Sequence, residues 1–166
     1  MSRAFVKEPD GDQVVDDQPE WPISPHTNYV TPYGIRQLND RRDAVLTRID
    51  ELKLNQEDMG NKIDLPSIER ELRYLNIRID TAKLINTKGI DDSVVNIGAT
   101  VKVIDENDKN YKFTIVGEDE ADIKLGKISW VSPLAKALLS RDLGDSVVWK
   151  RPVGDLIIEI DEISYD

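Results

Sequence analysis

The chain has 166 residues, of which 39% are hydrophobic. It contains 22 Lys and Arg and 32 Asp and Glu, which gives a formal net charge of −10. One or two modest hydrophobic cores fit this length. The absence of cysteine excludes disulfide scaffolds, thiolate zinc sites and cysteine nucleophiles, and we expect a cytoplasmic protein. The acidic balance argues against wrapping a nucleic-acid backbone, which is bound through clustered Lys and Arg. No apolar run approaches the roughly 18 residues of a membrane span, so we expect no membrane partner.

Residues 1–30 form an acidic segment in which we predict neither helix nor strand. Four prolines interrupt a run of Asp, Glu and Gln that has no apolar period. We interpret this segment as an extended or disordered arm. Trp21, Ile23 and Tyr29 are the exceptions, because such side chains near the end of an arm pack either on their own domain or on a partner. We favour packing on the arm's own domain.

Residues 31–87 are predicted to form an antiparallel hairpin of two helices. Thr31 followed by Pro32 supplies an N-cap with proline at the first helical position. Apolar residues then recur at alternating steps of three and four on both sides of a polar break at 55–61. The two stripes are Ile35, Leu38, Val45, Ile49 and Leu52, then Ile68, Leu72, Leu75, Ile79 and Ala82. Two antiparallel helices joined by this turn can cover each other's stripe.

Residues 88–166 change to the period of β-strands. Five β-rich runs lie at 100–104, 111–116, 127–131, 146–150 and 156–160. Because Asp, Asn and Gly separate them, they predict a small antiparallel sheet or half-barrel. Ser132 and Pro133, followed by Leu134 and Ala135, give an N-cap, a proline at the first helical position and a short apolar helix that should pack on the sheet. The predicted fold class is therefore α+β.

Four motifs in this third region carry a family resemblance. They are NIGATVKV at 96–103, TIVGEDEAD at 114–122, ISWVSPLAKAL at 128–138 and Gly144-Asp145. In this order they resemble the C-terminal domain of the GreA/GreB transcript-cleavage factors, and the predicted hairpin occupies the place of that family's coiled coil. The resemblance covers about residues 29–165 and implies an FKBP-like C-terminal domain.

The resemblance implies a bacterial elongation factor that binds RNA polymerase through its secondary channel. Such factors dock the C-terminal domain near the channel rim and push the hairpin inward, where acidic tip residues help the polymerase hold a metal ion and hydrolyse backtracked RNA. By the resemblance alone, the helix with Ser132, Pro133, Leu134 and Ala135 belongs to the polymerase-contacting surface. We expect a monomer that is not itself an enzyme, has no intrinsic cofactor, shares any Mg²⁺ with the polymerase and contacts transcript RNA only indirectly.

The tip of the hairpin departs from the family pattern. Cleavage-competent members carry a motif that reads like G-D-L-x-E-N-A-E-Y, whereas the stretch from Asn55 to Pro66 reads NQEDMGNKIDLP, so the family's catalytic acids are not carried over. Each helix is also about one heptad, or about 10 Å, shorter than usual. The acids near the turn, Glu57, Asp58 and Asp64, are candidates for assisting a metal, because Mg²⁺ takes carboxylate oxygens. The alternative is a solvated acidic turn in which Asp64 caps the second helix.

Two other functions compete with a cleavage factor. A Gre-like factor without cleavage activity, like the regulator Rnk with its short hairpin, would occupy the channel and inhibit or retune the polymerase. An FKBP-like peptidyl-prolyl isomerase would need an aromatic-rich pocket, which is hard to assemble from two Phe, five Tyr and three Trp. His26, the only histidine, has no Cys or His companions for a metal site and should be solvated. Trp130 and Trp149 lie in β-runs and should belong to the core or a sheet face.

Overall fold

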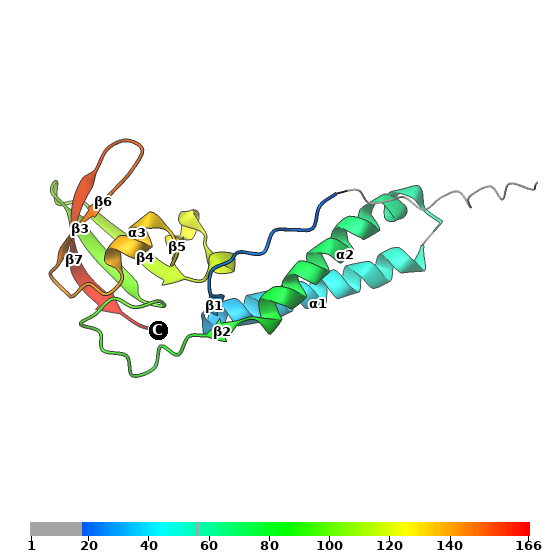
Figure 1. The fold of residues 1–166 in the computed structure, drawn as a ribbon, viewed down its shortest axis with the longest axis horizontal. Helices are drawn as coiled ribbons and strands as arrows, with labels where there is room; N and C mark the ends of the chain where they lie inside the picture. Colours follow the sequence, from blue (N-terminus) through cyan, green and yellow to red (C-terminus); the bar gives the residue numbers. More distant parts are fainter. Residues whose placement is uncertain (1–17, 56) are drawn as a thin grey trace, which may run out of the picture.

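The protein is a rod of two helices that projects from a small β-domain (Figure 1). The computed structural model describes residues 18–55 and 57–166. Their α+β architecture, a helical hairpin followed by a curled half-barrel sheet, is the predicted one. Within these two ranges, no helix is both long enough and apolar enough to cross a membrane.

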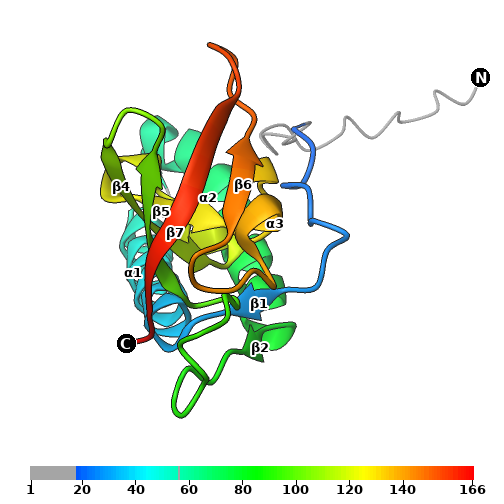
Figure 2. The same ribbon diagram turned by 90° about the vertical axis from the view of Figure 1, so that its left-hand side faces the viewer.

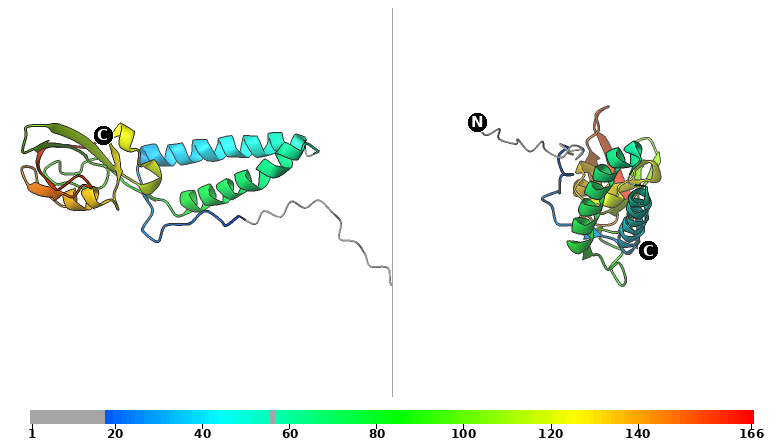
Figure 3. Two further views of the ribbon diagram at one scale, coloured as in Figure 1. Left: turned by 90° about the horizontal axis from the view of Figure 1, so that it is seen from above. Right: turned by 90° about the vertical axis from the view of Figure 1, so that its right-hand side faces the viewer.

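The rod consists of α1 (Pro32–Leu54) and α2 (Met59–Asp80), which run antiparallel to each other (Figure 3). α1 begins as predicted, because the Thr31 hydroxyl oxygen accepts a hydrogen bond from the backbone N–H of Gly34 at 3.1 Å and Pro32 follows the cap. The predicted apolar stripes meet between the helices. Leu38, Val45, Ile49 and Leu75 are buried there, and Ile35, Ile68, Leu72, Ile79 and Ala82 pack against them. The predicted hairpin is confirmed.

The second helix begins earlier than a cap at Asp64 would require. Asp58 is its N-cap, and one carboxylate oxygen accepts hydrogen bonds from two backbone N–H groups of the first turn, at 2.8 and 3.3 Å. Pro66 lies inside the helix, where it removes one backbone hydrogen bond. The cap at Asp58 and the packing of Leu65 against the seam offset that loss. The prediction that Asp64 caps the helix is therefore wrong.

The β-domain contains one five-stranded sheet in the order β5-β4-β3-β7-β6. Figure 2 shows β7 and β6 side by side, with the short helix α3 (Pro133–Leu138) next to β6. The strands are β3 (Thr100–Asp105), β4 (Asn110–Val116), β5 (Lys127–Ser129), β6 (Ser146–Trp149) and β7 (Leu156–Ser164). All neighbours are antiparallel except β4 and β5, which run parallel. The connection between those two strands holds two 3-10 turns, Glu118–Glu120 and Ile123–Leu125, and returns the chain to the same edge. The predicted small antiparallel sheet or half-barrel is therefore present, and the antiparallel pairing is corrected only at this edge.

β7 extends four residues beyond its predicted end. Its burial alternates from Leu156 to Ile160 and resumes at Ile163. The register against β3 shifts between Lys102 and Val103, which marks a β-bulge. A bulge inserts one residue and changes which residues of the strand face the core. The broken alternation explains why the pattern alone predicted an early end.

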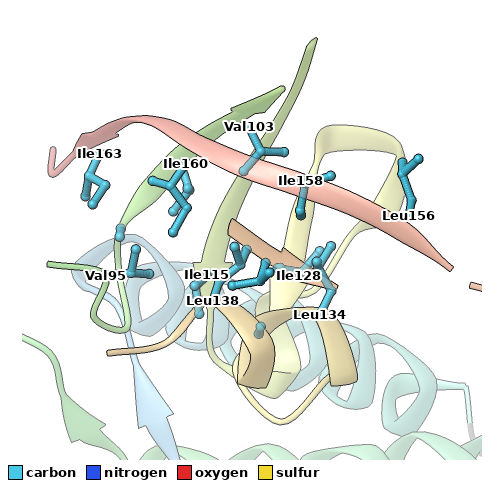
Figure 4. Close-up of a cluster of buried hydrophobic side chains, with 14 residues drawn as sticks. Val95, Val103, Ile115, Ile128, Leu134, Leu138, Leu156, Ile158, Ile160 and Ile163 are labelled. Atoms are coloured by element: carbon cyan, nitrogen blue, oxygen red, sulfur yellow. The ribbon is translucent and has the colours of Figure 1, made fainter. Parts of the chain in front are cut away.

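α3 (Pro133–Leu138) covers one face of the sheet, as predicted. Its N-cap is Ser132, whose hydroxyl oxygen accepts a hydrogen bond from the backbone N–H of Ala135 at 3.2 Å. Figure 4 shows apolar side chains of the sheet and the helix meeting between the two elements. The core they form includes Val95, Val101, Val103, Ile115, Leu134, Leu138, Ile158 and Ile160. Trp149 packs beside this core against the ring of Phe113, with 5.3 Å between ring centroids, as predicted for a sheet aromatic.

Residues 18–28 run beside α2 in an extended path (Figures 1 and 3). The ring of Trp21 packs against Tyr74, with 5.4 Å between centroids. The arm therefore packs on its own hairpin, as predicted, although Ile23 remains 41% exposed. The expectation of an extended or disordered chain over residues 1–17 falls outside the described residues.

The arm ends in a short parallel bridge at the base of the hairpin. β1 (Tyr29–Val30) pairs with β2 (Lys83–Leu84), a contact that the sequence did not predict. Tyr29 also packs edge-on against Trp130 of the β-domain, with 5.2 Å between ring centroids. His26 is exposed, as expected, and its ring lies 6.0 Å from that of Trp130. The end of the arm thus touches both the hairpin and the β-domain.

The buried seam yields a stability prediction. Leu75 is fully buried, so Leu75→Ala should lower the free energy of unfolding of the hairpin by about 2 to 5 kcal/mol. Ile77→Ala is the control on the same helix, because Ile77 is 42% exposed and should cost far less. Hydrogen exchange should show faster opening of α1 and α2 in the Leu75 variant, with sheet protection largely kept. Equal acceleration of hairpin and sheet would contradict the division into two cores.

Candidate functional site

The tip of the rod is a tight turn that brings two of the candidate acids together. The carbonyl of Asn55 accepts hydrogen bonds from the backbone N–H of Asp58 at 3.1 Å and from the side-chain amide of Asn61 at 3.0 Å. Glu57 and Asp58 are both exposed beside this closure. They line a shallow hollow together with Lys53, Leu54, Asn55 and Asn61. Two neighbouring carboxylates thus face solvent at the far end of the rod.

The third candidate acid lies apart from this pair. Asp64 is exposed on α2, beyond its first turn, and does not line the hollow. One oxygen of Asp58 is engaged in capping α2, so Glu57 is the acid of the neighbouring pair that has no capping role. Within residues 18–55 and 57–166, no three His, Cys, Asp or Glu side chains are grouped so that they could hold a metal ion. A hard cation at the tip would need ligands from outside the described residues.

The four candidate contact residues around α3 divide between surface and core. Pro133 is exposed and Ser132 is half-buried as the cap. Leu134 and Ala135 are 7% and 0% exposed and belong to the core under the sheet. Because an amphipathic helix turns part of its surface inward, these two side chains support the surface but cannot contact a partner. The prediction that they form part of the contact surface is corrected, and the exposed surface here is that of Pro133 and Lys136.

The turn Glu118–Glu120, which we name the acidic turn, joins the β-domain to the first turn of α1. The buried carboxylate of Glu120 accepts hydrogen bonds from the backbone N–H of Thr31 at 3.0 Å, from the Thr31 hydroxyl and from the N–H of Gly117 at 3.2 Å. The first turn of α1 contains no acid of its own, so Glu120 supplies the negative charge that a helix N-terminus favours. Gly34 lies so close that a Cβ there would overlap the Glu120 carboxylate.

The acidic turn also holds the last turn of α2. Arg78 is 2% exposed, and its Nε donates a hydrogen bond to Asp119 at 2.6 Å, with Glu118 at 3.8 Å from the same guanidinium. The Tyr74 hydroxyl donates to Asp119 at 2.5 Å, and burial together with this bond raises the pKa of Tyr74 to about 12. The side-chain amide of Asn28 donates to the carbonyl of Arg78 at 2.7 Å. Both helices of the rod are thus fixed by three consecutive residues.

This joint was missed at the level of sequence. The acidic turn belongs to a motif that carries the family resemblance, but three acids after a strand are also typical of a solvated loop. Arg78 precedes Ile79 of the apolar stripe, a position that usually faces solvent. One available signal was the lack of an acid in the first turn of α1, since a helix N-terminus favours negative charge from any source.

The comparisons with known proteins place this architecture in a family. A family model described as transcription elongation factor, GreA/GreB, C-terminal, matches residues 90–165. The transcription elongation factor GreA of Vibrio cholerae is 37% identical over 124 residues, which cover 74% of this chain and 79% of that relative. GreA of Nautilia profundicola is 35% identical over 156 residues, covering 85% of this chain and 96% of the relative. The chain belongs to the GreA/GreB family. The family-model match includes both the acidic turn and α3.

Other GreA/GreB matches differ in how much of the chain they cover. GreA of Trichlorobacter lovleyi is 43% identical over 100 residues, and the chain spans 63% of that relative. Among solved structures, the GreA/GreB factor from Nitrosomonas europaea is 22% identical with a TM-score of 0.43, over 82% of this chain and 98% of the other. GreA factor homolog 1 of Thermus thermophilus is also 22% identical, with a TM-score of 0.41, over 84% and 99%.

The joint gives a second prediction. Glu120→Ala leaves the N–H groups of Thr31 and Gly117 without their carboxylate acceptor and should lower the free energy of unfolding by about 2 to 4 kcal/mol. Glu106→Ala is the matched control, because Glu106 is exposed and such surface changes usually stay within about 0.5 kcal/mol. Urea denaturation followed by circular dichroism measures both variants. Equal stability of the two would argue against the joint.

Proposed function

We propose that this GreA/GreB family member binds bacterial RNA polymerase, inserts its hairpin tip into the secondary channel and modulates elongation. The observation that carries the proposal is the rod itself, which is fixed at its base by the acidic turn and presents Glu57 and Asp58 at its other end (Figure 1). A rod held in this way lets the docking position of the β-domain determine where the tip lies. The exposed surface of Pro133 and Lys136 would face the channel rim.

Stimulation of transcript cleavage would depend on the two tip carboxylates. Carboxylate oxygens suit Mg²⁺, which keeps several other ligands, and the polymerase would supply most of them. The protein would then lend charge to the polymerase's active site without being an enzyme or holding a cofactor of its own. Its contact with transcript RNA would be indirect and confined to the complex.

A Gre-like factor that occupies the channel without stimulating cleavage is the second candidate. The observation that favours it is the double duty of Asp58, whose Oδ1 atom caps α2 and is partly withdrawn from metal binding. Asp64 does not line the tip hollow and does not replace it there. On this second proposal the tip obstructs the channel and slows or retunes elongation.

A cleavage assay on stalled, backtracked complexes separates the two candidates. The test variant is Glu57→Gln with Asp58→Asn, because Asn caps a helix about as well as Asp and both charges are removed without loss of the cap. Asp64→Asn is the control, since it removes one charge from the same helix outside the hollow. If the tip acids assist cleavage, the wild-type protein and the control variant both stimulate it. The cleavage rate with the double variant should then be at least about tenfold lower, which corresponds to about 1.4 kcal/mol of lost transition-state stabilisation.

The other outcomes of this assay also discriminate. Wild type that binds the polymerase and slows elongation without cleavage identifies the non-cleaving factor. Stimulation that survives the double substitution excludes Glu57 and Asp58 as the metal-assisting pair and directs attention to Asp64. Wild type that neither binds the polymerase nor changes elongation contradicts the proposed function as a whole.

A further inference from the structure

The part of the arm that runs beside α2 lies on a face of the hairpin with arginines from both helices (Figures 1 and 3). We name it the arginine face and define it by Arg41 of α1 together with Arg70, Arg73 and Tyr74 of α2. The three α2 residues share one side of their helix, because residues three and four positions apart are neighbours on a helix surface. One short segment of the arm can therefore contact all of these side chains.

Two neighbouring side chains of the arm make the main contacts with the arginine face. Arg73 donates two hydrogen bonds to the two carboxylate oxygens of Glu20, at 2.5 and 3.0 Å, and these bonds lower the pKa of Glu20. Such paired bonds are the most specific contact that an arginine makes with a carboxylate. The ring centroid of Trp21 lies 5.4 Å from that of Tyr74 and 5.9 Å from the guanidinium carbon of Arg41. A carboxylate and an aromatic ring thus occupy the face side by side.

These two contacts hold the arm only lightly. The side chains of Glu20 and Arg73 are 61% and 52% exposed, and an ion pair in water contributes little net stability. Trp21 is also 36% exposed, so its ring is only partly covered. Further along the arm, Asn28 is buried and its side-chain amide donates a hydrogen bond to the carbonyl of Arg78. Residues 18–21 can therefore leave the arginine face while Asn28 stays in place.

The charge of the arginine face is mixed, which bears on what it can bind. Arg41 also pairs with Glu71 at 2.6 Å, and Arg70 is 2% exposed and donates a hydrogen bond to the side chain of Gln18 at 3.4 Å. A nucleic-acid backbone presents many phosphates and is bound through clustered Lys and Arg, whereas this chain has a net charge of −10. The face therefore suits a protein segment with one carboxylate better than it suits a nucleic acid.

We propose that the arginine face is a docking site for a segment of a partner protein with an acidic and an aromatic side chain, and that residues 18–21 close it by autoinhibition. The arm defines the chemistry of the occupant, since Glu20 supplies the carboxylate and Trp21 the ring. The partner is RNA polymerase, so this inference rests on the proposed function. A hairpin inserted into the channel would bring this face, which lies along its side, against the channel wall. The arm and the partner segment then compete for the same groups.

The affinity of the full chain for RNA polymerase tests this competition. A fluorescent label at Val153→Cys, an exposed position in the β6–β7 loop, allows binding to be measured by anisotropy, because the chain has no cysteine of its own. The release variant is Glu20→Gln with Trp21→Ala, which removes both contacts of the arm without removing a core side chain. The control variant is Glu106→Gln with Ile23→Ala. It removes the same charge from an exposed site and truncates an exposed side chain of the arm.

We expect the release variant to bind the polymerase about threefold to thirtyfold more tightly than wild type, because one exposed ion pair and one ring contact hold the arm closed. The control variant should bind as wild type does. Arg73→Gln, added to the release variant, should remove the gain. Equal affinity of wild type and release variant, or a gain that survives Arg73→Gln, overturns the inference and leaves the proposed function intact.

Two further outcomes separate the alternatives. Single-stranded RNA is the second probe, and binding of the release variant to it that depends on Arg73 assigns the face to nucleic acid and overturns the inference. If neither wild type nor release variant binds the polymerase, the proposed function and the inference both fail. Circular dichroism verifies the folding of each variant. Glu20→Gln alone, which changes only an exposed side chain, should give a smaller gain of the same sign.

Discussion

Three consecutive acids, Glu118–Glu120, hold the start of α1 and the end of α2 against the β-domain, at the base of the hairpin. Glu120 binds the first turn of α1, and Asp119 binds Arg78 in the last turn of α2. Each contact places charge where a helix end favours it, with the anion at the N-terminus and the cation at the C-terminus. Each also satisfies a buried polar group that would cost about 1 to 3 kcal/mol if left unpaired. The direction of the rod is therefore set by paired buried groups, and the long connection between β2 and β3 does not have to set it.

The base and the tip of the rod differ in the burial of their side chains. At the base, charged side chains are buried and paired, which favours a single arrangement. At the tip, Glu57, Asp58 and three large apolar side chains are exposed, which suits contact with something outside the two helices. Asp58 caps α2 there, and the proposed function would give the same carboxylate a second role in assisting a metal. A change of this residue therefore alters helix stability as well as charge, unless the new residue also caps.

Local signals in the sequence predicted most of the elements. Thr31-Pro32 and Ser132-Pro133 mark helix starts that the structure confirms, and alternating apolar residues located the five strands. The start of α2 was placed wrongly because Asp58 and Asp64 both have the chemistry of a helix cap. The end of β7 was placed too early because a bulge interrupts the alternation of buried residues. The parallel β4–β5 pair and the joint at Arg78 depend on contacts between distant segments, which no periodicity reveals. Leu134 and Ala135 show the limit of resemblance, because a family motif contains core residues as well as surface residues.

A rigid joint holds the tip at one distance from the β-domain, and that distance can be measured directly. Spin labels can be attached at Leu54→Cys on the tip and at Val153→Cys in the β6–β7 loop. The side chains that they replace are 83% and 85% exposed, so labelling should not disturb either core. Double electron–electron resonance should give one narrow distribution of distances between the two labels. This distribution should broaden when Arg78→Ala removes the contact with Asp119. A broad distribution in the protein with Arg78 intact, unchanged by the substitution, would contradict a hairpin fixed by the acidic turn.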